Sequence, residues 1–248
     1  MTKLVPKGYK KKVCEAVTHY WITLLKQAAK QTSGEADRGQ RSAVTGGKQM
    51  DGFCTLIHWA LVKNGLKDAE VHIAGKKNLT IPCFFRPTKQ WDILVVHDDH
   101  LVAAIEFKSQ RGPSFGNNFN NRTEEALGTA EDFWTAYREG AFGIDKPRPW
   151  TGWLMFLEDC EKSHVDVNLT EKYFQVLPEF KKTSYAQRYE ILARKLMHEK
   201  KYDHAAFLMA SKDGGSRGEY SEPAQDLTIH NFLASLAGHV RVYLESYK

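Results

Sequence analysis

Residues 91–110, with the sequence WDILVVHDDHLVAAIEFKSQ, are rich in Ile, Leu, Val and Ala, yet they carry acidic residues and a lysine near the two ends of the stretch. Asp92 lies near its start, and Glu106 and Lys108 lie near its end. Two carboxylates that are close together and shielded from water repel each other and lose hydration, so they need positive charge nearby. The lysine supplies one such charge. An oxygen-binding divalent ion would complete the balance, and Mg²⁺ commonly binds through one or two carboxylates, water and substrate phosphate.

These residue types suit the metal-assisted hydrolysis of a phosphodiester. The carboxylates would hold the ion, and Lys108 would orient or deprotonate the attacking water. A second interpretation is purely structural, because an acid followed at this distance by Glu-x-Lys often arises by chance and then forms a salt bridge on a sheet edge. The apolar setting of the charges and the order of the elements around them favour the catalytic interpretation.

The alternation of side chains predicts a β-hairpin that brings the charges together. Glu106 shares one face of the second strand with the lysine two residues later, because the side-chain period of a strand is two. If residues 98–100 form a three-residue loop, His97 pairs with Leu101, and Asp92 stands opposite Glu106 at ~5 Å on the same face. A two-residue loop without a bulge would instead place the two carboxylates on opposite faces.

The first strand has apolar residues on both faces, which is typical of a central strand covered on both sides. Alternation places Trp91, Ile93 and Val95 on one face, and Asp92, Leu94 and Val96 on the other. The hairpin is therefore predicted to lie inside the protein, with its charges shielded from solvent.

The segments on either side of the hairpin alternate between helical and extended patterns. Apolar residues recur at three- and four-residue steps over 9–30, and again after Asp51, which can cap a helix that ends at residues 64–65. Asn121 and Glu124 resemble a capping box. Further predictions are strands at 69–73, 79–85 and 150–159, a helix from Ser184 to about 199, a strand or helix at 203–211, and a helix from Thr228 to Tyr243. Predicted loops cover 31–49, 112–121 and 211–219.

Composition bounds the class of protein. With 248 residues, 42% of them hydrophobic, and no repeat or evident linker, the chain favours a single α/β domain over residues 1–248. The net charge of +5 permits a polyanionic partner without requiring one. The four cysteines lack the C-x-x-C pairs of a zinc ribbon, so reduced thiols in a cytoplasm are expected. No stretch approaches the ~20 apolar residues of a spanning helix, so no membrane partner is expected.

The predicted order of helix, hairpin, helix and strand resembles the core of the PD-(D/E)xK nucleases. That resemblance implies a restriction-endonuclease-like fold, a central mixed β-sheet flanked by helices, with a catalytic core over about residues 50–160 and extra N- and C-terminal helices. Trp91 departs from the motif, because it stands where the name of the motif has proline.

Four longer segments resemble the XhoI family of type II restriction endonucleases, and the resemblance covers most of the chain from about residue 85. They are IEFKSQRGPSFGNNFNNRTEEALGTAEDFWTAYREGAFG (105–143), RPWTGWLMFLEDCEKS (148–163), SYAQRYEILARKL (184–196) and GEYSEPAQDLTIHNFLASLAGHV (218–240). The resemblance implies a homodimeric, Mg²⁺-dependent enzyme that cuts both strands of DNA at the palindrome 5′-CTCGAG-3′. It also implies a restriction-modification system in a bacterial cytoplasm, with a cognate DNA methyltransferase that forms no stable complex with the enzyme.

The same resemblance implies roles for individual residues. The Asp, Glu and Lys of the nuclease motif fall on Asp92, Glu106 and Lys108. The two acids, with the backbone carbonyl of Phe107, would bind Mg²⁺, and the lysine would contact the water that attacks phosphorus, leaving 5′-phosphate and 3′-hydroxyl ends. A further acid often comes from the helix before the hairpin in this fold; Asp51 is the candidate, with helix capping as its competing role.

Base recognition is expected from side chains that match base edges, such as Arg with guanine, and Asn or Gln with adenine. The segment after the second strand is the first place to look, and it offers Gln110, Arg111, Asn117, Asn118, Asn120, Asn121 and Arg122. The competing interpretation is that asparagines in a Gly-rich loop only form local turns. Lys212 and Arg217 are weaker candidates, for phosphate contact or for solvation.

Three other functions remain open from the residues. One is a repair or recombination nuclease that recognises the shape of DNA. Another is a DNA-binding relative that has lost catalysis, against which the full set of Asp92, Glu106 and Lys108 argues. The third is a metal-free structural protein, which would leave the buried charges unexplained.

Overall fold

The computed structural model describes residues 3–32, 48–67, 71–73 and 79–247. Its helices and strands are α1 (Tyr9–Thr32), η1 (Lys48–Met50), α3 (Asp51–Lys63), β1 (Val71–Ile73), β2 (Thr80–Pro82), β3 (Thr88–Gln90), β4 (Ile93–His97), β5 (His100–Gln110), α4 (Phe115–Arg138), β6 (Trp150–Glu158), α5 (Glu161–His164), η3 (Pro178–Phe180), α6 (Tyr185–His198), β7 (His204–Ala210), α7 (Lys212–Ser216) and α8 (Ile229–Ser246). The predicted loop at 31–49 and the first residues of the strand predicted at 69–73 lie largely outside the described residues.

Five strands form a mixed sheet in the order β1-β4-β5-β6-β7, and β2 and β3 form a separate two-stranded sheet. The β1–β4 and β4–β5 pairs are antiparallel, whereas β5, β6 and β7 run parallel. Parallel neighbours need long crossovers, which here contain α4 and α6. The α/β class predicted from the sequence is confirmed.

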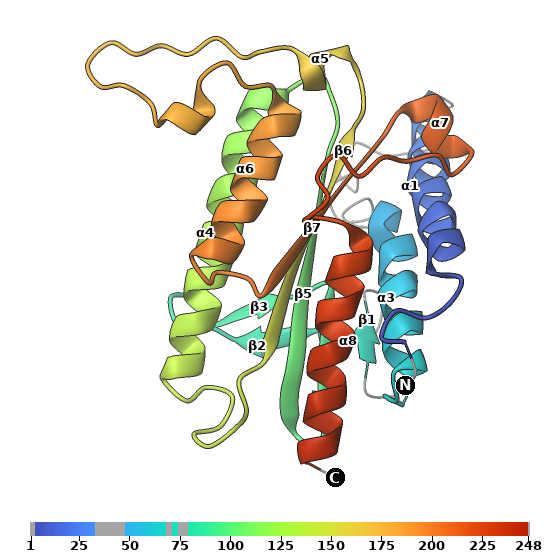
Figure 1. Cartoon of the computed structure of the whole chain (residues 1–248), viewed down its shortest axis with the longest axis vertical. Helices are drawn as coiled ribbons and strands as arrows, with labels where there is room; N and C mark the ends of the chain where they lie inside the picture. The colour runs from blue at the N-terminus through green and yellow to red at the C-terminus, as the bar shows by residue number, and fades with distance from the viewer. Residues whose placement is uncertain (1–2, 33–47, 68–70, 74–78, 248) are drawn as a thin grey trace.

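Helices cover both faces of the five-stranded sheet, with α4 and α6 on one side and α1, α3 and α8 on the other (Figure 1). The α1, α3 and α8 side buries Phe53, Ile57, Phe232 and Leu236 against Ile93, Val95 and Ile105. The α4 and α6 side buries Ala126, Phe133, Tyr189 and Leu192 against Leu94 and Ala104. Alternate residues of β5 thus face different layers, and Glu106 and Lys108 fall on the α4 side because they are in phase with Ala104.

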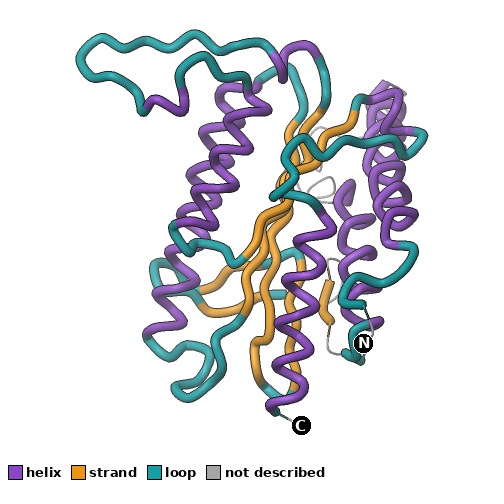
Figure 2. Tube along the Cα trace, in the orientation of Figure 1, coloured by secondary structure: helices purple, strands orange, loops and turns teal. Residues whose placement is uncertain are grey.

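The carboxyl ends of β5, β6 and β7 lie at one edge of the sheet, together with the first turns of α4 and with α5 and α7 (Figure 1). Figure 2 shows that the long loop between α5 and α6 projects from the same edge. In α/β proteins with parallel strands, ligands bind at the carboxyl ends of the strands. This edge is therefore the first place to seek a binding surface.

The hairpin between β4 and β5 turns through two residues, so the predicted three-residue loop is wrong. His97 pairs with His100, and the φ angles of Asp98 and Asp99 between them are 45° and 60°. Two successive residues with positive φ are typical of a type I′ turn, whose twist matches that of the adjoining strands. Aspartate tolerates this backbone region better than bulky residues do, which accounts for the Asp-Asp pair.

A β-bulge compensates for the shorter loop. The paired residues are Val96–Leu101, then Val95–Ala103, Leu94–Ala104 and Ile93–Ile105. Val102 is the extra residue, and its insertion shifts the register by one. Continuing the ladder by one residue places Asp92 opposite Glu106. The sequence predicted the same pairing from a three-residue loop, whereas the structure reaches it through a two-residue turn and a bulge.

Trp91 does not share a face with Ile93, contrary to the prediction. The chain bends at Asp92, before β4 begins, and the Trp91 ring packs against Phe133 of α4 with the ring centroids 5.2 Å apart. Ile93 instead lies in the core on the opposite side of the sheet. The bend thus keeps the indole on the side that carries Glu106.

α4 begins at Phe115, so the predicted loop at 112–121 is largely helical and Asn121 is not a cap. Gly and Asn are poor helix formers, but packing outweighs that preference. Phe119 contacts Tyr189 of α6 in an edge-to-face arrangement, with the ring centroids 5.1 Å apart. A Cβ added to Gly116 would lie 2.9 Å from the hydroxyl oxygen of Tyr185, so glycine permits this close approach.

The predicted loop at 211–219 contains a short helix, α7. Ser211 caps it by accepting a hydrogen bond from the backbone N–H of Gly214 at 3.1 Å. A Cβ on Gly215 would lie 2.2 Å from the indole of Trp21, so the glycines there allow α7 to approach α1 closely. The glycines of this segment therefore serve close helix packing rather than a loop.

Other boundaries are confirmed. Ser184 and Gln187 form the capping box that begins α6, and the Thr228 side chain accepts a hydrogen bond at the start of α8.

The predicted cap of α3 is wrong. Asp51 is the first residue of α3 and does not cap it, since Met50 occupies the cap position. None of the described helices is long and apolar enough to cross a membrane.

Candidate active site

The structure brings Asp92, Glu106 and Lys108 together at the open end of the hairpin. The Asp92 Oδ2 accepts a hydrogen bond of 2.7 Å from the backbone N–H of Phe107. Lys108 Nζ donates to Oε1 of Glu106. The Glu106 side chain is only 6% exposed, so the cluster is shielded as the sequence predicted.

A second lysine, which the sequence did not single out, completes the cluster. Lys89, in β3, donates to the other carboxylate oxygen of Glu106, with Nζ and Oε2 2.7 Å apart. It comes from the two-stranded sheet, 17 residues before Glu106 in the chain. Only the tertiary fold places it here, because an isolated lysine in a polar segment carries no sequence signal for such a position.

α4 contributes two further charges. Glu125 Oε2 lies 3.5 Å from Lys108 Nζ and 2.5 Å from Nη1 of Arg122. The Glu125 side chain is partly exposed, so it links the buried cluster to the surface of the helix. Glu125 lies in the middle of a helical stretch rich in polar residues, so the sequence carries no signal that distinguishes it.

Burial raises the pKa of Asp92 to about 6, and the negative charge of Glu106 adds to the rise. Burial would likewise raise the pKa of Glu106, but the charges and hydrogen bonds of Lys108 and Lys89 outweigh it and lower that pKa. Burial opposes the charged form of Lys108, yet Glu106 raises its pKa above the ordinary value. At neutral pH the cluster therefore holds an ionised glutamate beside the charged Lys108, next to an aspartate whose charged form is destabilised by burial.

Asp92→Asn is expected to raise the free energy of unfolding of the metal-free protein at pH 7.5 by about 3 kcal/mol. The native pKa of Asp92 is raised from 3.8 to about 6, so ionisation above pH 6 destabilises the folded state. Protonation relieves this cost, so the advantage of the variant should shrink as the pH falls from above 6 toward 4.

Urea unfolding in EDTA at pH 7.5 and pH 5 measures this effect. The asparagine carbonyl can keep the hydrogen bond from the Phe107 N–H, which makes the substitution a test of charge. A variant that is no more stable than wild type at pH 7.5, or whose gain is equal at both pH values, would contradict the account.

The donors fit a small, oxygen-binding divalent ion. Asp92 and Glu106 offer carboxylate oxygens, and the Phe107 carbonyl points to the Asp92 side, because the N–H and C=O of one residue in a strand face the same way. No group of three or more His, Cys, Asp or Glu side chains in the described residues could hold a metal. A two-carboxylate set is the kind that Mg²⁺ uses, since it retains several waters.

Asp51 is not brought to this cluster. It begins α3, on the other side of the sheet, and lines a cleft with Glu15 and His19 of α1. Burial raises its pKa, which the nearby charges of His19 and Lys48 oppose. Asp51 is also absent from the charged groups that shift the pKa values of Asp92, Glu106 and Lys108.

Gln110 faces inward rather than toward a ligand. It is 3% exposed; its amide nitrogen donates to the Phe115 carbonyl at 3.2 Å, and its amide oxygen accepts from the Tyr189 hydroxyl. Both ends of the amide are therefore occupied. The structure makes Gln110 a link between β5, α4 and α6.

The asparagines predicted to lie in a loop form part of α4 instead. Asn117, Asn120 and Asn121 are exposed and share one helical face, because residues three and four apart are neighbours on a helix. Asn118 is half-buried. A local-turn role is therefore excluded for these residues. Arg111 is exposed just before α4.

The remaining basic candidates lie on different parts of the surface. Arg122 is half-buried and paired with Glu125. Lys212 is exposed at the start of α7, and Arg217 pairs with Glu219 at 2.9 Å. Lys212 begins α7 and Arg217 follows it, and α7 packs on α1, whereas the asparagine face belongs to α4, on the other side of the sheet (Figure 1).

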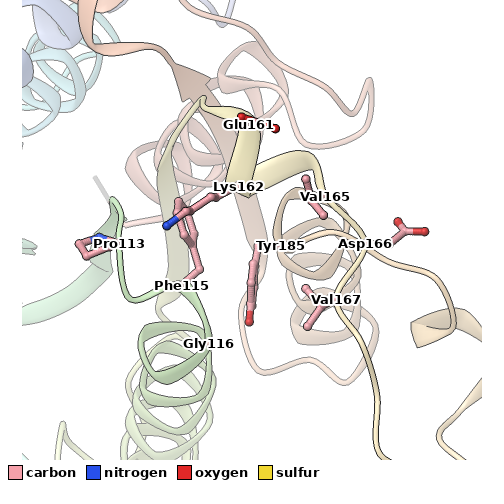
Figure 3. Close-up of a pocket in the computed structure, with 9 residues that line it drawn as sticks. All are labelled: Pro113, Phe115, Gly116, Glu161, Lys162, Val165, Asp166, Val167 and Tyr185. Atoms are coloured by element: carbon pink, nitrogen blue, oxygen red, sulfur yellow. The ribbon is translucent and has the colours of Figure 1, made fainter.

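A pocket lies at the same edge of the sheet, between the first turn of α4, α5 and the start of α6 (Figure 3). Its lining includes Phe115, Lys162, Asp166 and Tyr185. None of Asp92, Glu106 and Lys108 lines it, so the pocket is separate from the charged cluster.

Comparisons with known proteins give one consistent family. The family model described as restriction endonuclease XhoI matches residues 29–222, which begins well before the resemblance read from residue 85 onward. The type II restriction enzyme BstVI of Geobacillus stearothermophilus is 51% identical over 216 residues, which cover 85% of this chain and 95% of that protein.

Two further relatives match a shorter region. The type II restriction enzyme XhoI of Xanthomonas vasicola is 57% identical over 159 residues, 64% of each chain. The type II restriction enzyme AbrI of Azospirillum brasilense is 55% identical over 157 residues, 63% of this chain and 69% of its own. No solved structure matches the chain significantly.

Proposed function

Because the chain belongs to the XhoI family of restriction endonucleases, we propose that it cuts both strands of DNA at the palindrome 5′-CTCGAG-3′ in a Mg²⁺-dependent reaction. As a type II restriction enzyme it is a site-specific deoxyribonuclease. The observation that carries the proposal is that Asp92, Glu106 and Lys108 lie together at the open end of the buried β4–β5 hairpin. Two carboxylates beside an ammonium group are the residue types that metal-assisted hydrolysis uses, which supports the proposal.

Each residue of the cluster has a distinct role in this proposal. Asp92, Glu106 and the Phe107 carbonyl would hold Mg²⁺, which when bound would supply Lewis-acid polarisation of the phosphate and the attacking water. Lys108 is protonated and donates a hydrogen bond, so it positions the water rather than accepting its proton. In-line attack on phosphorus leaves 5′-phosphate and 3′-hydroxyl ends.

We propose that the exposed face of α4 with Asn117, Asn120 and Asn121 reads bases in the major groove. A helix fits that groove, and an asparagine amide can pair with both N6 and N7 on the major-groove edge of adenine. Glu125, beside Lys108, lies four to eight residues further along α4, which is ~6–12 Å at the helical rise. Arg111 and the exposed Lys212 and Arg217 are proposed to contact guanine or phosphate.

Replacing the exposed asparagines one at a time by alanine is expected to weaken discrimination between bases. At least one of Asn117→Ala, Asn120→Ala and Asn121→Ala should lower, about tenfold or more, the ratio of cleavage rates for 5′-CTCGAG-3′ and a site with one altered A·T pair. Asn168→Ala, at an exposed position outside α4, is the matched control. Three unchanged ratios would remove α4 from base recognition.

The partners follow from the symmetry of the substrate. A palindrome presents the same sequence on both strands, so we propose a two-fold symmetric homodimer with one cluster acting on each strand. A cognate DNA methyltransferase would protect the host's own sites without forming a stable complex with the enzyme. The bacterial cytoplasm, where the host DNA lies, is the proposed location.

The arrangement of elements supports a restriction-endonuclease-like core. The helix, hairpin, helix and strand that the sequence predicted correspond to α3, β4–β5, α4 and β6. We propose that they form the catalytic core, over about residues 50–160, of a single domain spanning residues 1–248, with α1 and α8 as additions to it. Asp51, on the opposite side of the sheet, is left out of the proposed metal site.

Digestion of random-sequence DNA, followed by sequencing of the ends, tests the proposed specificity and chemistry. The ends should map to 5′-CTCGAG-3′ alone, symmetrically on both strands, and should ligate directly because they carry a 5′-phosphate. Ends scattered over many sequences would indicate a shape-reading nuclease instead. Ends at another palindrome would keep the chemistry and replace the recognition sequence.

A further inference from the structure

Both carboxylate oxygens of Glu106 are occupied by ammonium groups, one on each side. Lys108 donates to Oε1, and Lys89 donates to Oε2 at 2.7 Å. A divalent ion that binds Glu106 must take or share one of these oxygens. Metal entry therefore competes with a lysine that the fold has already placed there.

Lys89 is held more firmly than a surface lysine. Besides Glu106, its ammonium donates to the backbone carbonyl of Gln90 at 2.9 Å, and it lies 4.6 Å from the ring centroid of Trp91. Its side chain is 11% exposed. Ion pairs of exposed lysines contribute little, because water and rotamer entropy compete with them, whereas this ammonium is largely shielded.

The charges of the cluster balance without a metal. Asp92 and Glu106 carry two negative charges when ionised, and Lys108 and Lys89 carry two positive ones. The hairpin sequence alone shows a single lysine, which leaves one negative charge for an ion to balance. The structure supplies the second cation from the chain itself.

We propose that Lys89 is the counter-ion that occupies the position of the metal on Glu106 and must leave Oε2 when the divalent ion binds. This inference rests on the proposed function, because it takes Glu106 as a metal ligand. It makes Lys89 a regulator of metal affinity, a role that none of the residues inferred from the sequence has.

Lys89, rather than Lys108, is the lysine that leaves. Lys108 belongs to the same strand as Glu106 and has Glu125 at 3.5 Å as a second acidic partner. Lys89 belongs to β3, outside the five-stranded sheet. Its ammonium also contacts the Gln90 carbonyl and the face of the Trp91 ring, and neither contact requires Glu106. Indole is the best cation-binding aromatic side chain.

Contact with the Lys89 ammonium gives Trp91 a role that proline, which the nuclease motif has at this position, could not fill. Proline has no π face to hold a cation. The Trp91 ring is buried against Phe133, a contact that does not involve Glu106. Trp91 is therefore the platform on which the displaced lysine rests.

Competition between Tb³⁺ and Mg²⁺ on the full-length protein tests this inference without DNA. Tb³⁺ binds oxygen donors, and its emission is sensitised by a nearby indole such as Trp91. Wild type, Glu106→Gln, Lys89→Met, Lys89→Arg and Lys195→Met are compared by the Mg²⁺ concentration that displaces half of the bound Tb³⁺. Lys195, paired with Glu179 at 2.6 Å on the surface, is the matched control.

Lys89→Met keeps the apolar stem and removes the charge, so it should bind Mg²⁺ on the order of tenfold more tightly than wild type. Lys89→Arg keeps the charge and should bind no more tightly than wild type, and Lys195→Met should match it. If Lys89→Met does not fold, Lys89→Gln removes the same charge and serves in its place.

Two different failures can be told apart. If wild type binds the ions and Glu106→Gln does not, but neutral variants at Lys89 bind no more tightly than wild type, the counter-ion role is overturned and the metal site stands. If no binding depends on Glu106 in any variant, the metal site of the proposed function fails, and the counter-ion role fails with it.

Discussion

Glu106→Gln is expected to slow DNA cleavage at saturating Mg²⁺ by about 10³-fold or more, equivalent to about 4 kcal/mol of lost transition-state stabilisation. Glu106 is the central acid of the cluster: without metal it accepts hydrogen bonds from two lysines, and it is proposed to bind the ion. The amide has nearly the same shape but no charge. DNA binding should persist, because the base-reading face lies on α4.

Single-turnover cleavage and a gel-shift assay on the same duplex in Ca²⁺ separate these two effects. Glu179→Gln breaks another Glu–Lys pair, 2.6 Å long and exposed, and should leave both measurements as in wild type. Cleavage within tenfold of wild type by Glu106→Gln would remove Glu106 from the catalytic machinery. Loss of binding together with cleavage would indicate a folding or docking role instead.

Lys108→Met is expected to slow single-turnover cleavage by about 10²- to 10³-fold, the usual cost of losing a positioned catalytic donor. The methionine keeps the stem but cannot donate to water or balance Glu106. Without that charge, burial should raise the pKa of Glu106, so cleavage should fall further as the pH is lowered.

The contrast with Lys89 makes this prediction specific. Both lysines contact Glu106, yet removal of Lys108 should slow the chemical step, while removal of Lys89 should tighten metal binding. Lys108→Arg should not restore the rate, since a planar guanidinium cannot take the place of a compact ammonium. A Lys108→Met enzyme that cuts within about threefold of wild type would assign Lys108 to charge balance alone.

The hairpin shows how far periodicity can locate a site. The period of two placed Glu106 and Lys108 on one face, and apolar residues on both faces of β4 marked it as an interior strand. The predicted turn was one residue too long. Asp92 and Glu106 nevertheless stand opposite each other, because a bulge at Val102 shifts the register by one residue. A bulge leaves no clear mark in one sequence, since valine is an ordinary strand residue.

α4 shows where local composition misleads. Gly116 and the asparagines that follow it favour a loop by intrinsic preference, but Phe115 and Phe119 pack against α6 and extend the helix by two turns. Which aromatic residues of α6 would face them could not be known before the fold. The asparagines that were predicted to form turns therefore lie on a helix, and three of them form an exposed face of it.

Lys89 shows what sequence patterns leave out. Its role depends on contacts with Glu106, with the Gln90 carbonyl and with the Trp91 ring. The contact with Glu106 exists only after two separate sheets are brought together. A pattern built on one hairpin could find the acids and the adjacent lysine, and it had no means to find the second cation.

The most direct test of the proposed activity is the digestion of two plasmids that differ only in a single 5′-CTCGAG-3′ site, with wild-type protein in Mg²⁺ or in EDTA. The account predicts that only the plasmid with the site is linearised, and only in Mg²⁺. Protein that retards the site-bearing plasmid without cutting it in Mg²⁺ would contradict the account and leave a DNA-binding protein without nuclease activity.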